Sequence, residues 1–467
     1  MQPADPTSES LTDASLVEFF FRAARPDPSS HLVGTELEKF GVALGADGSV
    51  STPTFEDHIA PTLAKLVELF GWGPGSDRGT GGETVDLARD GASITLEPGG
   101  QLELSGKPLR NVHETCAEFS EHFRELDEVA RQLSMTWMAA GFHPWATRAE
   151  VNWMPKGRYE IMRNYLPSRG GLALDMMKRT CTVQANFDYA SEADCASKFR
   201  IANAVAPLVT ALFANSPYIE GKAVGLVSAR SRTWTDMDPD RCGIPRFVFD
   251  GEFSFQRYVD WALDVPMFFI KRNGEYYAHH ATFRAFKEDG FTAPDGVHHA
   301  ATADDWAGHL STVFPEVRLK PHLEVRSPDA VPSAYVCGLP ALSKGVLYDD
   351  DAGLEIWEPL SGLSYDERMA LWQEAYTHGL ASDRIRSLCR VFLAASRAGL
   401  DRLDVRDEQG RGESRFLDKL DELVERGMTP GDSVRRKLGD NPGTGPAARR
   451  AFAREFHFAG VMPDADG

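Results

Sequence analysis

Hydrophobic and polar residues alternate along several short stretches of the chain, a period of two that is typical of β-strands with one buried face. The segment 31–44, HLVGTELEKFGVAL, shows this pattern first. Residues 92–106 predict two strands joined by a Pro-Gly-Gly turn. Residues 181–189 and 318–327 give two further strand segments. The chain therefore contains the strands of a sheet, spread widely along the sequence.

Helical periodicity separates these strands. Residues 55–70 and 112–140 each predict an amphipathic helix, the second ending just before Gly141. Residues 191–213 predict a third helix, which opens with a Ser-Glu-Ala-Asp capping pattern. Strands and helices mix without a steady βαβ rhythm, which favours an α+β fold with a mainly antiparallel sheet.

The change of pattern along the chain also predicts its domains. We expect an N-terminal tail with a short helix over 1–30 and a main domain over 31–360, which carries all the predicted strands. Beyond about residue 361 the periodicity is helical with charged faces, so 361–467 is expected to be a helical C-terminal region packed on the main domain.

Polar side chains recur two residues apart within the predicted strands, and such positions share one face of a sheet. They are Glu36, Glu38, Gln184, Asn186, Asp188, Glu324 and Arg326. Glu97, Gln101 and Glu103 join this face if Pro98-Gly99-Gly100 is the hairpin loop, whereas a two-residue loop would separate them. Any one alternation also fits the wetted face of an amphipathic strand. Together they predict a sheet face lined by four or five glutamates and one arginine.

The composition adds an acidic charge balance. The 467 residues include 69 acidic and 50 basic side chains, a formal net charge of −19. This balance argues against a nucleic-acid or anionic-membrane surface, because both need clustered Lys and Arg. The apolar stretches are also shorter than the roughly 20 residues that span a bilayer. We expect a soluble protein without nucleic-acid or membrane partners.

Carboxylates gathered on one face repel one another unless cations lie between them. Mg²⁺ takes oxygen ligands and commonly bridges carboxylates to substrate phosphates. Arg326, on the face of Glu324, could then bind a transferring phosphoryl group through two hydrogen bonds. These residue types predict a site for a metal ion and a nucleotide.

A segment with three arginines lies between the third and fourth predicted strands, at 229–241. Such a loop can dock a substrate carboxylate, although surface salt bridges explain it equally well. The arginines are Arg230, Arg232 and Arg241. Metal, nucleotide and carboxylate together indicate ATP-dependent activation of an acid.

The cysteines and the N-terminus bear on the compartment. The six cysteines are scattered without a CxxC pair, which argues against zinc-ribbon and thioredoxin-type motifs. The first ten residues, MQPADPTSES, are polar and acidic, unlike a secretory or transit peptide. We expect reduced thiols and a cytoplasmic location.

Longer strings of the sequence match a known family in order along nearly the whole chain, weakening only over 1–30 and after about residue 400. The clearest are GTELEKFG (34–41), ITLEPGGQLELSG (94–106), LDMMKRTCTVQANFDY (174–189), SARSRTWTDMDPDRCG (228–243) and HLSTVFPEVRLKPHLEVR (309–326). On these strings the chain resembles glutamate–cysteine ligase of the plant and proteobacterial type, one of the glutamine-synthetase-like ligases.

The resemblance implies a curved, mainly antiparallel sheet whose concave face holds ATP and Mg²⁺, with helices packed outside. The main domain would then be the catalytic one. The implied reaction joins the γ-carboxylate of glutamate to the amine of cysteine through a γ-glutamyl phosphate and releases ADP and phosphate, as the first step of glutathione biosynthesis. The partners would be these small molecules, with the protein a monomer or homodimer.

Carried over by position, the resemblance also assigns roles to residues. The ligands of Mg²⁺, more than one ion, would be Glu36, Glu38, Glu97, Glu103 and Glu324. Arg326 would stabilise the phosphoryl group, with Glu36 and Glu324 as further catalytic residues. The substrate-binding candidates are Arg230, Arg232 and Arg241 for the glutamate carboxylate, Arg179 and Thr180 for the cysteine pocket, and Gln184 and Asn186 along the lining strand.

One cysteine pair of the family is missing here and another is kept. Plant enzymes carry a pair in the segment that matches 276–294, which contains no Cys in this chain. The other family pair corresponds to Cys116 and Cys337. We expect these two to be able to form a disulfide that affects activity or dimerisation; the alternative is two ordinary buried thiols.

Other functions stay open. A ligase of the same fold could use a different amine, and the same product could feed ergothioneine synthesis. A glycoside hydrolase would need only two carboxylates and no arginine for a phosphoryl group. A catalytically inactive relative is disfavoured, since none of the expected acidic residues is lost.

Overall fold

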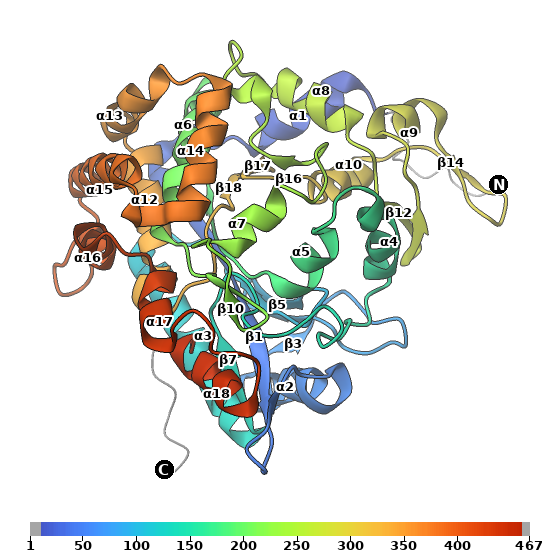
Figure 1. Cartoon of the computed structure of the whole chain (residues 1–467). Coiled ribbons are helices and arrows are strands. Elements are labelled where there is room, and N and C mark those ends of the chain that lie inside the picture. Colours follow the sequence, from blue (N-terminus) through green and yellow to red (C-terminus); the bar gives the residue numbers. More distant parts are fainter. Residues whose placement is uncertain (1–10, 460–467) are drawn as a thin grey trace.

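A ten-stranded sheet runs through the computed structural model, which describes residues 11–459 (Figure 1). The strand order is β17-β18-β8-β1-β6-β5-β4-β3, with β2 and β7 also paired to β1, and its pairings are antiparallel. The bounds are β1 Val33–Leu44, β2 Val50–Ser51, β3 Gly73–Pro74, β4 Leu87–Arg89, β5 Ala92–Leu96, β6 Leu102–Ser105, β7 Met135–Met138, β8 Val183–Phe187, β17 Val317–Leu319 and β18 Leu323–Val325. The predicted mainly antiparallel sheet is confirmed.

β1 is the central strand, and it changes partners along its length. Its first half pairs with β6 on one side and β8 on the other, and its second half pairs with β7 and then β2. Val33 and Leu37 are fully buried on one face of this strand. Because side chains alternate along a strand, Glu36 and Glu38 lie on the opposite face.

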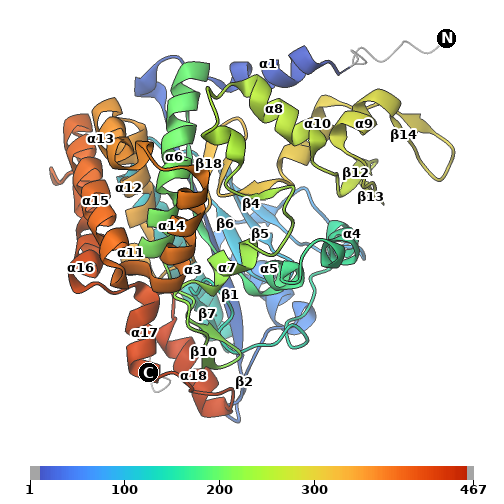
Figure 2. The same ribbon diagram turned by 45° about the horizontal axis from the view of Figure 1, so that its top comes forward.

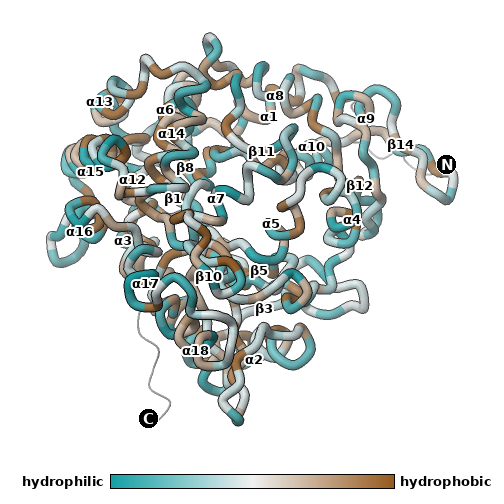
Figure 3. The backbone as a smooth tube through the Cα atoms, viewed as in Figure 1, coloured by the Kyte–Doolittle hydropathy of each residue, from teal (hydrophilic) through white to brown (hydrophobic). Residues whose placement is uncertain are grey.

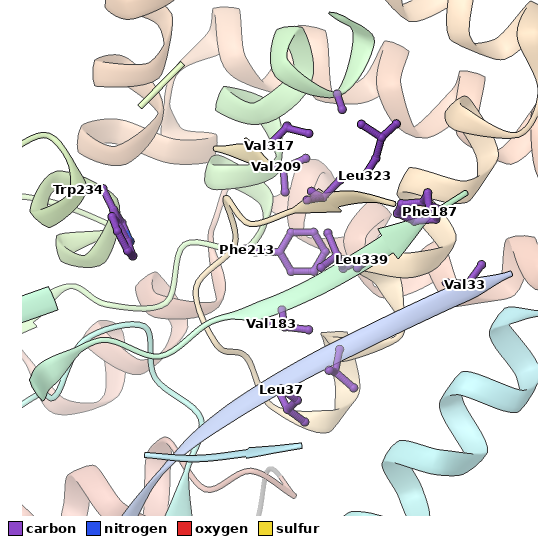
Figure 4. Packing of buried hydrophobic residues seen from close by; sticks show 14 of the residues in the cluster. Val33, Leu37, Val183, Phe187, Val209, Phe213, Trp234, Val317, Leu323 and Leu339 are labelled. Atoms are coloured by element: carbon purple, nitrogen blue, oxygen red, sulfur yellow. The ribbon is translucent and has the colours of Figure 1, made fainter. Parts of the chain in front are cut away.

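The hydrophobic face of the sheet packs against three helices: α3 (Val112–Gln132), α6 (Glu192–Leu212) and α12 (Gly338–Leu347). Figure 4 shows residues of β1, β8 and β18 gathered with Val209, Phe213 and Leu339 in one buried cluster. Burial of this apolar surface stabilises the fold by roughly 25 cal/mol per Å². The helices therefore occupy one face of the sheet and leave the polar face for the site.

The C-terminal part is helical, as predicted from its periodicity. It comprises α13 Asp350–Ser361, α14 Tyr365–His378, α15 Asp383–Leu403, α16 Asp418–Arg426, α17 Pro430–Leu438 and α18 Pro446–Glu455. α15 packs on α12 and α13, while α14 lies along α6 (Figure 2). Hydrophilic colours dominate α16 and α17 in Figure 3, which fits their place at the edge of the molecule.

Shorter elements complete the fold. The helices are α1 Asp13–Ala23, α2 Ala60–Phe70, α4 Gly157–Tyr165, α5 Ala173–Arg179, α7 Ala229–Trp234, α8 Phe255–Asp264, α9 Phe283–Asp289, α10 Ala303–Leu310 and α11 Ser333–Val336. The small sheets use β9 Tyr218–Ile219, β10 Lys222–Ala223, β11 Cys242–Gly243, β12 Phe269–Arg272, β13 Glu275–Ala278, β14 Phe291–Thr292, β15 His298–His299 and β16 Phe314–Pro315. Over the described part of the chain, none of the helices has the length and apolar character needed to cross a membrane.

Two predicted elements differ from the structure. The helix expected over 112–140 ends at Gln132; the chain turns at Ser134, whose φ is +51°, and continues as β7. Pairing of β7 with β1 outweighs the helical periodicity of this segment. The predicted tail over residues 1–10 lies outside the described residues.

The strand expected over 318–327 is a hairpin of β17 and β18. Pro321 lies at its turn, where Lys320 N–H donates to His322 O at 2.9 Å. Proline has no N–H for a continuous ladder, so the chain folds back at this point.

Candidate active site

A cavity of about 280 Å³ lies on the polar face of the sheet. β1, β6, β8 and β17 of the main sheet contribute lining residues, Glu97 directly follows β5, and α4, α5, α7, β12 and β16 contribute further walls. Of the residues proposed from the sequence, it is lined by Glu36, Glu38, Glu97, Glu103, Gln184, Thr180, Arg230 and Arg326. Segments far apart in the sequence thus meet in one site.

Four carboxylates of this cavity form what we term the acidic face: Glu36, Glu38, Glu97 and Glu103. Strand register explains the grouping, because Glu38 is directly opposite Glu103 across β1 and β6. Glu97 N–H donates to Gln101 O at 2.9 Å, and Leu96 is opposite Leu102. Pro98-Gly99-Gly100 is therefore the hairpin loop, and Glu97 and Glu103 share one face.

Burial and mutual repulsion raise the pKa of three acids in the acidic face. Burial, with the charges of Glu324 and Glu103, raises the pKa of Glu36 to about 7. Burial and the neighbouring Glu97 and Glu103 raise the pKa of Glu38 well above its usual range. The pKa of Glu103 is raised by burial and by Glu97, against a hydrogen bond from Ser105. The acidic face holds more negative charge than its surroundings neutralise.

Glu324 has a different environment from the acidic face. It is fully buried and accepts two hydrogen bonds from Arg318, at 2.6 and 3.0 Å. Lys320 Nζ lies 3.0 Å from its Oε1 atom, and Arg326 Nη1 donates to its Oε2 atom at 2.9 Å. Burial alone would raise the pKa of Glu324, but these three cations hold it well below its usual range. We term Arg318, Lys320 and Arg326 the cation cluster.

The two polar residues of β8 connect these groups. Gln184 Oε1 accepts a hydrogen bond of 2.8 Å from Arg326 Nη1. Asn186 Nδ2 donates to Glu36 Oε1 at 3.3 Å, while its Oδ1 atom is buried without a partner. β8 lies between β1 and β18, so its side chains bridge the acidic face and the cation cluster.

The three arginines of 229–241 separate in the structure. Arg230 lines the cavity, where its guanidinium donates to Arg326 O at 2.9 Å and Ser327 O at 3.1 Å. Arg232 binds Thr235 Oγ1 at an exposed position. Arg241 is fully buried and bonds to Asp238, Pro266 O and Thr312 O. Among the three, Arg230 lies where a substrate could reach it.

The predicted pair beside the cysteine pocket also separates. Thr180 lines the cavity, with its hydroxyl donating to Met176 O at 2.7 Å. Arg179 bonds to Asp175, Ala146 O and Glu220 and lies outside the cavity lining.

Several cavity residues escaped the sequence prediction. Arg318 and Lys320 have the same spacing of two as Glu324 and Arg326, so the signal was present in RLKPHLEVR. Other lining residues come from short helices and short strands, for which the sequence offers no comparable pattern: Arg158, Tyr159, Met162, Met176, Met177, Trp234, Phe269 and Phe314.

The acidic face fits Mg²⁺ by its chemistry. Its donors are hard carboxylate oxygens, and the raised pKa values of Glu36, Glu38 and Glu103 reflect charge that a cation would neutralise. Within residues 11–459, no three His, Cys, Asp or Glu side chains are already clustered tightly enough to hold a metal ion. Hard carboxylate oxygens suit Mg²⁺, which usually keeps several waters and uses one or two carboxylates together with substrate phosphates.

Cys116 and Cys337 are joined by a disulfide. It links α3 to the residue between α11 and α12, with a Cα–Cα distance of 5.8 Å. The other described cysteines, Cys181, Cys195, Cys242 and Cys389, are free thiols. The pairing is the one that the family resemblance implied.

Comparison with known proteins places the chain in a family. The family model "Glutamate-cysteine ligase family 2" matches residues 32–453. The chloroplastic glutamate–cysteine ligases of Brassica juncea and Arabidopsis thaliana are each 40% identical over 432 residues, covering 91% of this chain and 81% and 80% of theirs. A crystal structure of glutamate–cysteine ligase from Francisella tularensis in complex with AMP shares the fold, with a TM-score of 0.53, 13% identity and coverage of 93% and 90%.

The relatives contradict one prediction and establish the family. The cytoplasmic location expected from the sequence is wrong by this comparison, because the relatives at 40% identity are named chloroplastic. The family match spans nearly all of the described residues, and the identity is well above what fold alone produces. The chain therefore belongs to glutamate–cysteine ligase family 2.

Proposed function

We propose that this protein is an ATP- and Mg²⁺-dependent ligase that joins the γ-carboxylate of L-glutamate to the amine of L-cysteine. The products are γ-glutamylcysteine, ADP and phosphate, in the first step of glutathione biosynthesis. One observation carries the proposal: the acidic face, Arg326 and Arg230 line a single cavity in a chain of this family. Its partners are these small molecules, and it works as a monomer or homodimer.

The chemistry explains why the site combines acids with arginines. A carboxylate is a poor electrophile, so its oxygen first attacks the γ-phosphorus of ATP and displaces ADP. The amine then attacks the resulting acyl phosphate and displaces phosphate. The protein positions the reactants and neutralises charge on the transferring group.

The residues divide this work between them. Glu36, Glu38, Glu97 and Glu103 would hold Mg²⁺, which when bound neutralises phosphate charge. Arg326 is oriented by Gln184 and Glu324, and its remaining N–H groups serve the phosphoryl oxygens. Glu324, paired with the cation cluster, would act mainly by orienting those cations.

Arg230 is our candidate for the glutamate carboxylate. Two of its N–H groups bind the carbonyls of Arg326 and Ser327, which fixes the guanidinium while leaving further donors. Its buried position strengthens an ionic hydrogen bond with a substrate carboxylate.

The apolar part of the cavity lining supports cysteine as the amine. It contains Met162, Met176 and Met177 together with Phe269 and Phe314. Thioether and aromatic groups are polarisable and pack well against sulfur. A small thiol side chain fits this lining better than a charged or strongly polar one.

A same-fold ligase for another amine, or a product used for ergothioneine, is the alternative. ADP release with glutamate, ATP and Mg²⁺ tests it, with candidate amines added singly. Cysteine-dependent ADP release supports the proposal. Release with a different amine only would move the assignment to that amine, and no release with any amine would overturn the ligase function.

A further inference from the structure

A buried carboxylate outside the cavity lining connects the elements that carry Arg230 and Arg326. Asp329 is 1% exposed and follows β18 by four residues. Its Oδ2 atom accepts hydrogen bonds from Asn215 N–H at 2.7 Å and Ser216 Oγ at 2.6 Å. Its Oδ1 atom accepts one from Ser228 Oγ at 2.8 Å. Three donors from two other segments thus meet on one carboxylate.

The two serine hydroxyls also accept hydrogen bonds from backbone N–H groups of α7. Ser216 Oγ accepts a hydrogen bond from Arg230 N–H at 3.2 Å, and Ser228 Oγ accepts one from Ser231 N–H at 3.0 Å. The first N–H groups of a helix have no partner within the helix, so these contacts fix where α7 begins. The start of α7 is therefore tied to Asp329.

The connection closes on the strand that carries Arg326. Arg230 leaves the first turn of α7 and donates to the carbonyls of Arg326 and Ser327, the residues that lead to Asp329. A ring of contacts thus runs from Asp329 through Ser216 and Ser228 to Arg230 and back. Neither Arg230 nor the end of β18 can shift without breaking it.

The space around Asp329 is tightly filled. A Cβ atom built on Gly141 would lie 2.1 Å from the Asp329 Cγ atom, so the backbone is packed directly on the carboxyl group. An amide at this position could accept through one oxygen only. Its NH₂ group would face either Asn215 N–H and Ser216 Oγ or Ser228 Oγ, all of which now donate to the carboxylate, so at least one of these hydrogen bonds would be lost.

We infer that Asp329 is a positioning residue for the glutamate site, which holds α7 so that Arg230 faces the cavity beside Arg326. This inference rests on the proposed function, in which Arg230 contacts the glutamate carboxylate. It assigns a role to a residue that touches no substrate.

The test compares Asp329→Asn with a matched control, Glu413→Gln. Glu413 is also 1% exposed and accepts from Val112 N–H and Lys344 Nζ, each at 2.6 Å, away from the cavity lining. Both variants remove a buried carboxylate and lower Tm. We expect Asp329→Asn alone to raise KM for glutamate, lowering kcat/KM about tenfold with KM for ATP unchanged.

A double-mutant cycle tests whether Asp329 affects kcat/KM through Arg230. If Asp329 acts through Arg230, the loss in kcat/KM caused by Asp329→Asn should largely disappear in an Arg230→Lys background, while the losses in Tm still add. Additive losses in kcat/KM, or the same kinetic change in Glu413→Gln, would overturn the inference. If Asp329→Asn does not fold, Ser216→Ala removes one link only and should show the same pattern in weaker form.

Hydrogen exchange separates this inference from the proposed function. The amides of Arg230 and Ser231 are protected by the two serines, so exchange of a peptide covering 228–235 should quicken in Asp329→Asn and stay unchanged in Glu413→Gln. This result does not depend on activity. A wild-type protein without ADP release would overturn the proposed function, whereas unchanged exchange in Asp329→Asn would overturn the role of Asp329.

Discussion

Arg326 donates from Nη1 to Glu324 Oε2 across 2.9 Å, and this contact distinguishes Glu324 from the acids that line the cavity. Glu324 is neutralised by the cation cluster, and its pKa lies well below its usual range despite burial. The pKa values of Glu36 and Glu38 are raised by burial and by their acidic neighbours. Glu324 stabilises the metal-free fold, whereas Glu36 and Glu38 oppose it.

This difference predicts opposite effects of removing charge. At pH 8 without metal, Glu36→Gln should raise the free energy of unfolding, by about 2 kcal/mol, because it removes an ion with a strongly raised pKa. Glu324→Gln should lower it, since the buried Arg318 and Arg326 and the half-buried Lys320 would lose their partner. Urea unfolding measures both, with the exposed Glu355→Gln as control. Equal changes in the same direction would contradict this difference.

The pKa of Glu36 also predicts how Mg²⁺ binding depends on pH. Its value of about 7, against an ordinary 4.5, means that protonation stabilises the metal-free fold. That stabilisation is complete below pH 4.5 and is lost as the pH rises through 7. Mg²⁺ must displace this proton, so the rise in Tm on adding Mg²⁺ should be larger at pH 8 than at pH 6. A Tm shift independent of pH would argue against Glu36 as a ligand. In Glu36→Gln, the shift in Tm caused by Mg²⁺ should differ less between pH 6 and pH 8.

The separation of the arginines predicts which one binds glutamate. Arg230→Lys should raise KM for glutamate at least about tenfold, because Lys cannot reproduce the two-pronged donor arrangement. Arg232→Lys should leave KM unchanged, since Arg232 lies outside the cavity lining and its side chain hydrogen-bonds to Thr235. Steady-state kinetics with glutamate as the varied substrate distinguishes them. A larger increase in KM for glutamate in Arg232→Lys than in Arg230→Lys would place the binding site of the substrate carboxylate outside the cavity.

The disulfide predicts a dependence of stability on redox state. Cys116 and Cys337 are 221 residues apart, and closing a loop of this size restricts the unfolded chain by about 3–5 kcal/mol. Cys116→Ser should therefore unfold at lower urea than the oxidised wild type, and dithiothreitol should remove the difference. If thiol titration after mild oxidation found both Cys116 and Cys337 free, the disulfide would be ruled out. Activity and size-exclusion profiles of the same samples test its link to catalysis or dimerisation.

The sequence predicted the polar face well because a strand has a strict period of two. Glu36 and Glu38 needed no tertiary information, and the hairpin loop decided the side on which Glu97 lies. Arg318 was missed because a continuous strand over 318–327 would place it far along the strand from Glu324. The turn at Pro321 instead makes Arg318 and Glu324 direct partners across the hairpin. Arg230 and Arg232 were grouped because the segment was expected to be a loop. On the helix α7, side chains two positions apart point in different directions. The positions of Met162, Met176 and Met177 depend on how α4 and α5 pack, which no local sequence pattern encodes.

In the proposed reaction, the cavity activates the γ-carboxylate of glutamate as an acyl phosphate. Glutamate labelled with ¹⁸O in the γ-carboxylate tests it most directly, in a reaction with ATP, Mg²⁺ and cysteine. The oxygen that attacks phosphorus leaves with the phosphate when the amine displaces it, so we predict one ¹⁸O atom per inorganic phosphate by mass spectrometry. γ-Glutamylcysteine formed with unlabelled phosphate, or ADP release without peptide, would contradict the account.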